Sequence, residues 1–147
     1  MSINTKSGRF QILCIDADVD TARWINERLI GENIQCDLVT VLTGREGFRR
    51  LNSQDFDLCI LEYALPDMTG VQLCALMRQL RSPVPMLFFT PMNRPIDRQN
   101  AEAAGAAAYI VKPDDLDIFV DTALHLMKRR GRLYAFEGPK QDLARAA

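Results

Sequence analysis

The stretch FDLCILEYALPDMTG, residues 56–70, decides the fold of this chain. It contains the apolar run Leu58–Leu61, which ends in a single acid, Glu62, and is followed by a turn rich in proline, aspartate and glycine. Continuous apolar runs are typical of parallel strands that are covered by helices on both faces. A turn of this composition separates such a strand from the next element. The stretch therefore predicts a buried parallel strand whose last side chain is a carboxylate.

The rest of the chain repeats this pattern of an apolar strand followed by a helix. Helical periodicity follows each apolar run, and Pro95 and Gly105 are typical of the first turn and the end of one such helix. The predicted strands are at residues 11–15, 36–42, 58–61, 84–89 and 107–111, and the predicted helices at 18–30, 43–52, 71–80, 95–105 and 116–127. Strand and helix pairs in this number predict an α/β fold with a doubly wound, five-stranded parallel sheet.

Composition excludes several classes of protein. With 147 residues, of which 48% are apolar and 25% charged, the chain fits one globular domain. Its formal charge of −1 gives no global attraction to nucleic acid or to anionic lipid. We expect a cytoplasmic protein, because we find neither a membrane-spanning run nor a secretory signal. The four cysteines form no CxxC pair, so we interpret them as reduced packing residues.

Polar residues follow several of the predicted strands. In doubly wound sheets, ligands bind at the carboxyl ends of the strands. Acids that meet a lysine at this edge form either a divalent-cation site or a mutually neutralised polar patch. Asp18 has a second interpretation as the N-cap of the following helix. The residues at the strand ends are Asp16 and Asp18 after the first strand, Glu62 after the third, Thr90 after the fourth and Lys112 after the fifth.

The motifs ILCIDAD, FDLCILEYALPDMTG, PMLFFT and AAYIVKP occur in this order along the chain. Together they resemble the receiver domain of bacterial two-component response regulators. The resemblance covers about residues 10–128 and implies a flavodoxin-like fold with strand order 2-1-3-4-5. We expect an N-terminal extension at residues 1–9, the receiver domain at 10–130, and a tail or linker at 131–147.

The resemblance implies a role for each residue at the strand ends. In that family an aspartate after the third strand accepts a phosphoryl group from phosphohistidine, and Glu62 holds this position here. An acidic pair after the first strand binds Mg²⁺, and the corresponding residues are Asp16 and Ala17. The hydroxyl residue and the lysine that contact the phosphoryl group correspond to Thr90 and Lys112.

Two switch positions also have a structural interpretation. The hydroxyl of Thr90 can bond its own turn, and Pro91 stiffens the loop on which it would move. Tyr109, three residues before the lysine, corresponds to the aromatic residue that reports switching on the output face. Alternatively, Tyr109 is a half-buried packing residue whose hydroxyl reaches water.

Two departures from the family pattern bear on function. Glutamate carries its carboxylate about 1.5 Å further than aspartate, the length of one C–C bond. A misplacement of ~1 Å can cost ~10²-fold in rate. Ala17 removes a carboxylate oxygen from the metal site, and Asp18 could replace it only if the loop were reshaped. We therefore expect that no cofactor is required, that Mg²⁺ binding through Asp16 and Glu62 is weak or lost, and that Glu62 reaches toward Lys112 as a partial mimic of phosphoaspartate.

These considerations lead us to expect a degenerate receiver, without enzymatic activity, that acts by protein–protein interaction. The expected interaction face comprises the fourth helix, the fifth strand and the fifth helix, around residues 98–128. Its expected partner is a histidine kinase, a phosphotransfer protein or an output protein; a homodimer stays open, and we expect no direct contact with nucleic acid or membrane.

Two other functions remain as alternatives. The first is a receiver that is still phosphorylated, on Glu62 or a nearby acid, with weak Mg²⁺ dependence. The second is a flavodoxin-like nucleotide or flavin enzyme. The loop DADVD disfavours this enzyme, because its three acids would repel a phosphate.

Overall fold

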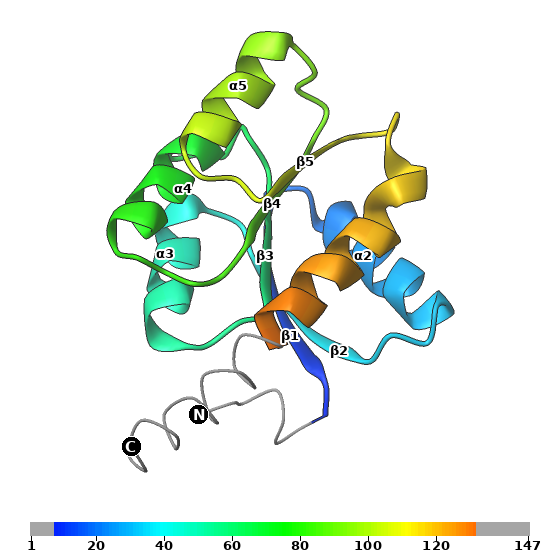
Figure 1. The fold of residues 1–147 in the computed structure, drawn as a ribbon. Helices are drawn as coiled ribbons and strands as arrows, with labels where there is room; N and C mark the ends of the chain where they lie inside the picture. Colours follow the sequence, from blue (N-terminus) through cyan, green and yellow to red (C-terminus); the bar gives the residue numbers. More distant parts are fainter. Residues whose placement is uncertain (1–7, 132–147) are drawn as a thin grey trace, which may run out of the picture.

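The fold is a five-stranded parallel sheet with helices on both faces (Figure 1). The computed structural model describes residues 8–131. The strand order is β2-β1-β3-β4-β5, and every pairing between neighbouring strands is parallel. This confirms the predicted α/β fold and its 2-1-3-4-5 order. The strands are β1 (Phe10–Ile15), β2 (Cys36–Val41), β3 (Leu58–Leu61), β4 (Met86–Thr90) and β5 (Ala108–Val111).

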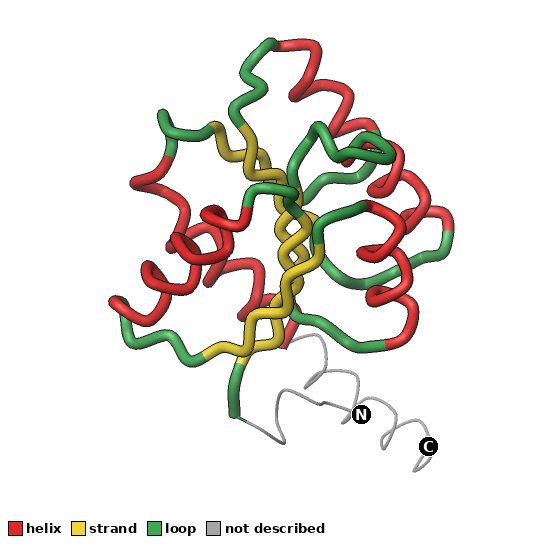
Figure 2. The backbone as a smooth tube through the Cα atoms, turned by 180° about the vertical axis from the view of Figure 1, so that it is seen from behind, coloured by secondary structure: helices red, strands yellow, loops and turns green. Residues whose placement is uncertain are grey.

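The helices form two layers around the sheet. In Figures 1 and 2, α2 and the helix at residues 119–131, which we call the C-terminal helix, cover one face, and α3, α4 and α5 cover the other. The helices are α2 (Val19–Gly31), α3 (Gly44–Ser53), α4 (Gly70–Gln79) and α5 (Pro95–Ala103), and a 3₁₀ turn, η1 (Leu116–Ile118), precedes the C-terminal helix. The strand ends therefore form an edge that lies between these layers.

Each face of the sheet has its own apolar core. Because successive side chains of a strand point to opposite faces, Phe88 and Phe89 of β4 belong to different cores. Phe88 packs among residues of the α3, α4 and α5 side. Phe89 packs with Trp24 of α2 and Phe119 of the C-terminal helix, with ring centroids 5.4 Å and 4.7 Å away. Helices that are far apart in sequence are thus joined through β4.

Some predicted element bounds were wrong, for physical reasons. The strand predicted at 84–89 begins at Met86, because Pro85 has no N–H with which to extend the ladder. The last helix does not begin at Leu116, since η1 intervenes. Strand β2 lies at an edge of the sheet, so Asp37 and Thr40 are exposed rather than covered on both faces.

Other expectations can be compared directly with the described residues. The four cysteines, Cys14, Cys36, Cys59 and Cys74, are buried free thiols, which confirms their interpretation as packing residues. Within residues 8–131, no helix is long and apolar enough to cross a membrane. Most of the expected extension and tail, residues 1–7 and 132–147, lies outside the described part of the chain.

Candidate functional site

Side chains from three strand ends meet around the ammonium group of Lys112. Its Nζ lies 3.2 Å from Oδ2 of Asp16, which follows β1, and 3.9 Å from Oε2 of Glu62, which follows β3. The sequence predicted that these residues share one edge of the sheet, and the structure brings them together. Sequence reasoning missed Thr21, whose Oγ1 lies 3.2 Å from the same Nζ. Its position three residues after Asp18, on the first turn of α2, is the signal that could have identified it.

This Lys112 cluster, comprising Asp16, Thr21, Glu62 and Lys112, is largely withdrawn from solvent. The side chains of Asp16, Glu62 and Lys112 are 6%, 14% and 21% exposed. The ammonium also lies 4.9 Å from the ring centroid of Phe89, within the range of a cation–π interaction. The charge of Lys112 is therefore matched by groups of the protein itself.

The carboxylates of the cluster are engaged by donors of the protein itself. Asp16 accepts a hydrogen bond from the backbone N–H of Asp18 on Oδ1, while Oδ2 accepts from Lys112. Glu62 accepts from the backbone N–H of Tyr63 on Oε1, at 2.6 Å, and Ala17 offers no side-chain oxygen. Among residues 8–131, no three His, Cys, Asp or Glu side chains form a group that could hold a metal. Both oxygens of Asp16 and one oxygen of Glu62 therefore accept from, or pair with, groups of the protein.

Asp18 lies at the same edge but performs a different task. Its carboxylate accepts a hydrogen bond from the backbone N–H of Asp20 at 3.0 Å and caps the N-terminus of α2. Asp20 lies in the first turn, where a negative charge complements the helix dipole. The helix-cap interpretation of Asp18 is thus confirmed, and its carboxylate is directed to α2 rather than to the missing ligand position of Ala17.

The loop after β4 is held by two side chains that bond the same residue, Met92. The buried Thr90 accepts a hydrogen bond from the backbone N–H of Met92 on Oγ1, which confirms that its hydroxyl bonds its own turn. Tyr109 donates from Oη to the backbone carbonyl of Met92 at 2.7 Å. We call Thr90, Met92 and Tyr109 the Met92 latch. It fixes the segment between β4 and α5.

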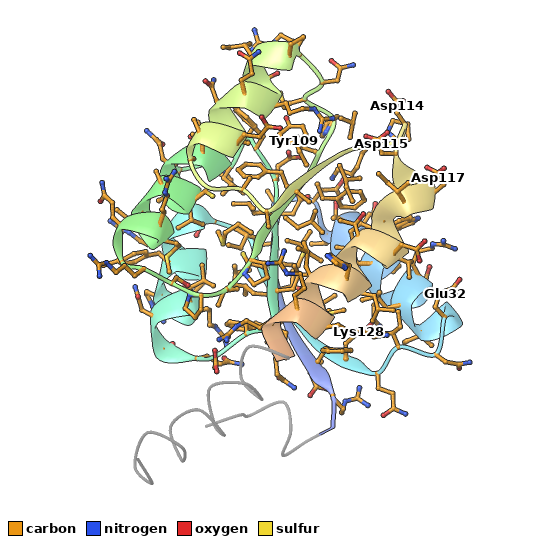
Figure 3. The ribbon with its side chains drawn as sticks, viewed as in Figure 1. Glu32, Tyr109, Asp114, Asp115, Asp117 and Lys128 are labelled. Atoms are coloured by element: carbon orange, nitrogen blue, oxygen red, sulfur yellow. The ribbon has the colours of Figure 1, made fainter. Side chains whose placement is uncertain are left out.

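The environment of Tyr109 corrects one expectation. Its hydroxyl was expected to reach water from a half-buried ring, but the residue is only 7% exposed and bonds Met92. Tyr109 belongs to β5, and Figure 3 shows it on the α5 side of the sheet. Its ring stacks on Phe88, with centroids 5.6 Å apart, and the guanidinium of Arg98 lies over it at 4.9 Å. Burial, with a smaller effect of the nearby Asp97 charge, raises the pKa of Tyr109 to about 12.

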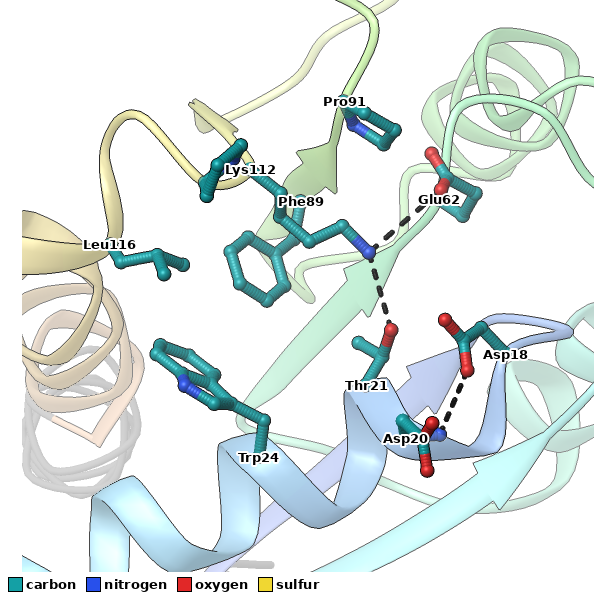
Figure 4. A pocket seen from close by; sticks show the side chains of 10 residues that line it. Asp18, Asp20, Thr21, Trp24, Glu62, Phe89, Pro91, Lys112 and Leu116 are labelled. Atoms are coloured by element: carbon teal, nitrogen blue, oxygen red, sulfur yellow. Dashed lines mark hydrogen bonds and ion pairs between the residues drawn. The ribbon is translucent and has the colours of Figure 1, made fainter.

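A hollow of about 430 Å³ opens beside the Lys112 cluster (Figure 4). In this view the Lys112 side chain extends between an apolar half and an acidic half of the hollow. The apolar half includes rings from α2 and β4. The lining residues are Asp18, Asp20, Thr21, Trp24, Glu62, Phe89, Pro91, Lys112, Pro113 and Leu116.

Comparison with known proteins identifies the family of this chain. A family model described as the response regulator receiver domain matches residues 12–123. The chain belongs to this family. Response regulator ArlR of Staphylococcus aureus (strain Mu50) is 30% identical over 120 residues, which are 82% of this chain and 53% of that protein. The transcriptional regulatory protein PcoR of Escherichia coli is 29% identical over 119 residues, 81% of this chain and 52% of its own length. This receiver thus spans about half the length of these curated relatives.

Solved receiver structures agree with the fold of this receiver. A two-component response regulator from Clostridium difficile is 28% identical and superposes with a TM-score of 0.71, covering 82% of this chain and 98% of its own. A signal receiver domain from Vibrio parahaemolyticus gives a TM-score of 0.79 at 22% identity, covering 88% and 98% of the two chains. The described structure is therefore that of a two-component receiver, a kind of domain that interacts with kinases or other proteins.

Proposed function

We propose that this receiver acts as a protein-interaction module without standard aspartate phosphorylation. The observation that carries the proposal is the engagement of Glu62 and Lys112 with the protein itself. One oxygen of Glu62 is bound by the backbone N–H of Tyr63, and the other faces Lys112. A carboxylate held in this way is poorly placed for in-line attack on phosphorus, because phosphoryl transfer depends on positioning.

The second support is electrostatic. Since the resemblance implies a Mg²⁺ ion between the acids after β1 and β3, the ammonium of Lys112 takes over part of that neutralising charge. It lies within 4 Å of both Asp16 and Glu62. A lysine committed to these acids is less available to an incoming phosphoryl group. We infer that the site needs no metal and no other cofactor.

The third support is the Met92 latch. The resemblance implies that the positions of Thr90 and Tyr109 carry the signal from a phosphoryl group to the output face. Here both side chains already bond Met92. We therefore place the interaction face on α5, β5 and the C-terminal helix, where Ile96 is 49% exposed and Arg98 and Lys128 are exposed. The partner class is a histidine kinase, a phosphotransfer protein or an output protein.

The test is a backbone-amide NMR titration with Mg²⁺ and then beryllofluoride, which imitates a phosphoryl group. We expect no saturable shifts for Asp16, Glu62, Thr90, Tyr109 and Lys112 at millimolar Mg²⁺, because the acids are already paired. The matched control is the double variant Ala17→Asp/Glu62→Asp, which restores both family residues and is expected to gain Mg²⁺-dependent shifts. Beryllofluoride shifts that reach Tyr109 in the wild-type protein would favour the phosphorylatable receiver instead.

A further inference from the structure

We propose that the hollow beside Lys112 binds a small organic cation that carries an aromatic ring, and that this ligand is the input of the receiver. The proposal deepens the proposed function and rests on it in one respect: a receiver without phosphorylation needs another input at the same edge of the sheet. The binding itself is measured separately from phosphorylation.

The size and the apolar half of the hollow fit an aromatic group. A volume of about 430 Å³ falls within the range of small-molecule sites, roughly 300–1,000 Å³. The wall is the partly exposed ring of Trp24, which is held in place by Phe89 and Phe119, at centroid distances of 5.4 Å and 5.2 Å. Phe89 itself is only 2% exposed and supports this ring from within the core. Leu116 extends this wall from η1. Aromatic rings favour offset or edge-to-face contact with such a surface.

The charge of the lining favours a cation over an anion. Three acids, Asp18, Asp20 and Glu62, and one base, Lys112, line the hollow, so their formal charges sum to −2. Lys112 is paired with both Asp16 and Glu62, and Asp20 lies 3.8 Å from Arg23. When Asp16 and Arg23 are counted as well, the formal charges still sum to −2. A phosphoryl group would add negative charge beside these acids, whereas an ammonium group would approach them favourably. Asp18 and Asp20 are exposed at the rim, so each contributes a modest amount.

The hollow also adjoins the loop that carries the Met92 latch. Pro91 lines the hollow and lies between Thr90 and Met92 in the chain. A ligand in contact with Pro91 therefore touches the segment that both latch bonds hold. This contact gives the ligand a physical route to Tyr109 and to the interaction face, through a side chain that is stiff by its own chemistry.

Binding can be followed with the natural fluorescence of the protein, because Trp24 is the only tryptophan of the chain and lines the hollow. The probe is phenethylamine, and the controls are 3-phenylpropionate, which has the ring with the opposite charge, and propylamine, which has no ring. We expect a saturable change in Trp24 emission with phenethylamine in the millimolar range, as suits a fragment of this size. We expect 3-phenylpropionate to bind at least about tenfold more weakly.

Matched variants connect the signal to the acidic half. Asp20→Asn is expected to weaken phenethylamine binding about two- to fivefold, in line with an exposed ion pair. The control is Asp121→Asn, which removes an exposed acid that lies on the C-terminal helix and does not line the hollow. This variant is expected to bind phenethylamine with unchanged affinity. Equal affinity for phenethylamine and 3-phenylpropionate, or no saturation with either compound, overturns the proposal of a cation site.

A second measurement distinguishes this proposal from the proposed function. Phenethylamine is expected to shift the backbone amides of Met92 and Tyr109 in NMR spectra, whereas Mg²⁺ and beryllofluoride are not. Binding without any shift at these amides overturns the role of the ligand as an input. A response to beryllofluoride contradicts the proposed function, while the fluorescence titration still decides whether the hollow binds a cation.

Discussion

At the scale of single residues, Lys112 joins parts of the chain that are nearly a hundred residues apart. Its ammonium bonds Asp16 at a separation of 96 residues and Thr21 at 91 residues. Asp16 is only 4% exposed, so water has little access to its carboxylate and Lys112 is its one cationic partner in the Lys112 cluster. Removal of one member of a buried ion pair leaves the other charge without compensation, which is more costly than removal of both.

We therefore predict that Lys112→Met lowers the free energy of unfolding by about 2–3 kcal/mol, because it leaves Asp16 buried without its cation. The double variant Asp16→Asn/Lys112→Met is expected to recover part of this loss. Urea unfolding measures both. The control Lys128→Met, at an exposed position, should change stability by less than about 0.5 kcal/mol. A loss for Lys112→Met no larger than for this control would mean that the pair contributes nothing to stability.

Tyr109 provides a prediction about pH. Its pKa in the folded protein is about 12, above the ordinary value of 10. A raised folded-state pKa means that stability is fully present below pH 10 and is lost as the pH rises toward 12, because the unfolded chain ionises first. We expect one tyrosine to titrate late by ultraviolet absorbance, and Tyr109→Phe to remove that late phase. If the late phase persists in Tyr109→Phe, another tyrosine produces it.

The residues that meet at the site could be predicted from sequence, but the hydrogen bonds that they form could not. The order of strands and acids was enough to bring Asp16, Glu62 and Lys112 to one edge. The partner of Tyr109 is the backbone carbonyl of Met92, and a carbonyl has no signature in the sequence. The second oxygen of Glu62 turns back to its own neighbour Tyr63, a choice of rotamer that depends on the surrounding packing.

At the scale of elements, the junction between β3 and α4 is tight. Helix α4 begins at Gly70 and is capped by Thr69, whose side chain accepts from the backbone N–H of Gln72. A Cβ atom at Gly70 would lie 2.5 Å from the backbone oxygen of Glu62 and 2.9 Å from the ring of Phe88. The glycine therefore lets the first turn of the helix approach the strand end that carries Glu62.

Gly70→Ala is predicted to lower the free energy of unfolding by about 2 kcal/mol or more, because the backbone oxygen cannot move aside without distorting β3. The matched control is Gly31→Ala at the end of α2, where an added Cβ meets nothing within 4 Å. That change should be neutral or stabilise by up to about 1 kcal/mol. Thermal or urea unfolding compares the two, and equal effects would show that the contact at Gly70 is easily relieved.

The elements themselves were largely predictable, because they follow hydrophobic periodicity and local caps. Thr43, for example, caps α3 by accepting from the backbone N–H of Glu46, close to the start predicted from sequence. The 3₁₀ turn before the C-terminal helix was not predicted. Its residues satisfy the same apolar spacing as a helix, and only the path of the chain from β5 decides between the two.

At the scale of the whole molecule, the two apolar cores protect the thiols that the strands and α4 contribute. Burial raises the pKa of Cys14 to about 12 and that of Cys74 to about 11. The thiolate is the reactive form, so the folded protein keeps these groups inert at neutral pH. Their reactivity therefore reports how often the cores open.

We predict that iodoacetamide labels Cys14, Cys59 and Cys74 slowly in the folded protein at about pH 8 and rapidly in guanidinium chloride, because labelling requires opening of the core. Mass spectrometry of digested samples measures each site. Lys112→Met should accelerate labelling by the factor by which its loss of stability raises the population of the open state, about tenfold for each 1.4 kcal/mol. Rapid labelling of the wild-type protein without denaturant would contradict the burial of these thiols.

The Met92 latch has a consequence for the direction of signalling. A switch that rests with both bonds formed has little room to be activated further, since an equilibrium already on one side can be moved appreciably only toward the other. An input at this edge of the sheet should then reduce partner binding rather than increase it. The proposed function, taken with this resting arrangement, thus predicts that the domain responds to its input by repression.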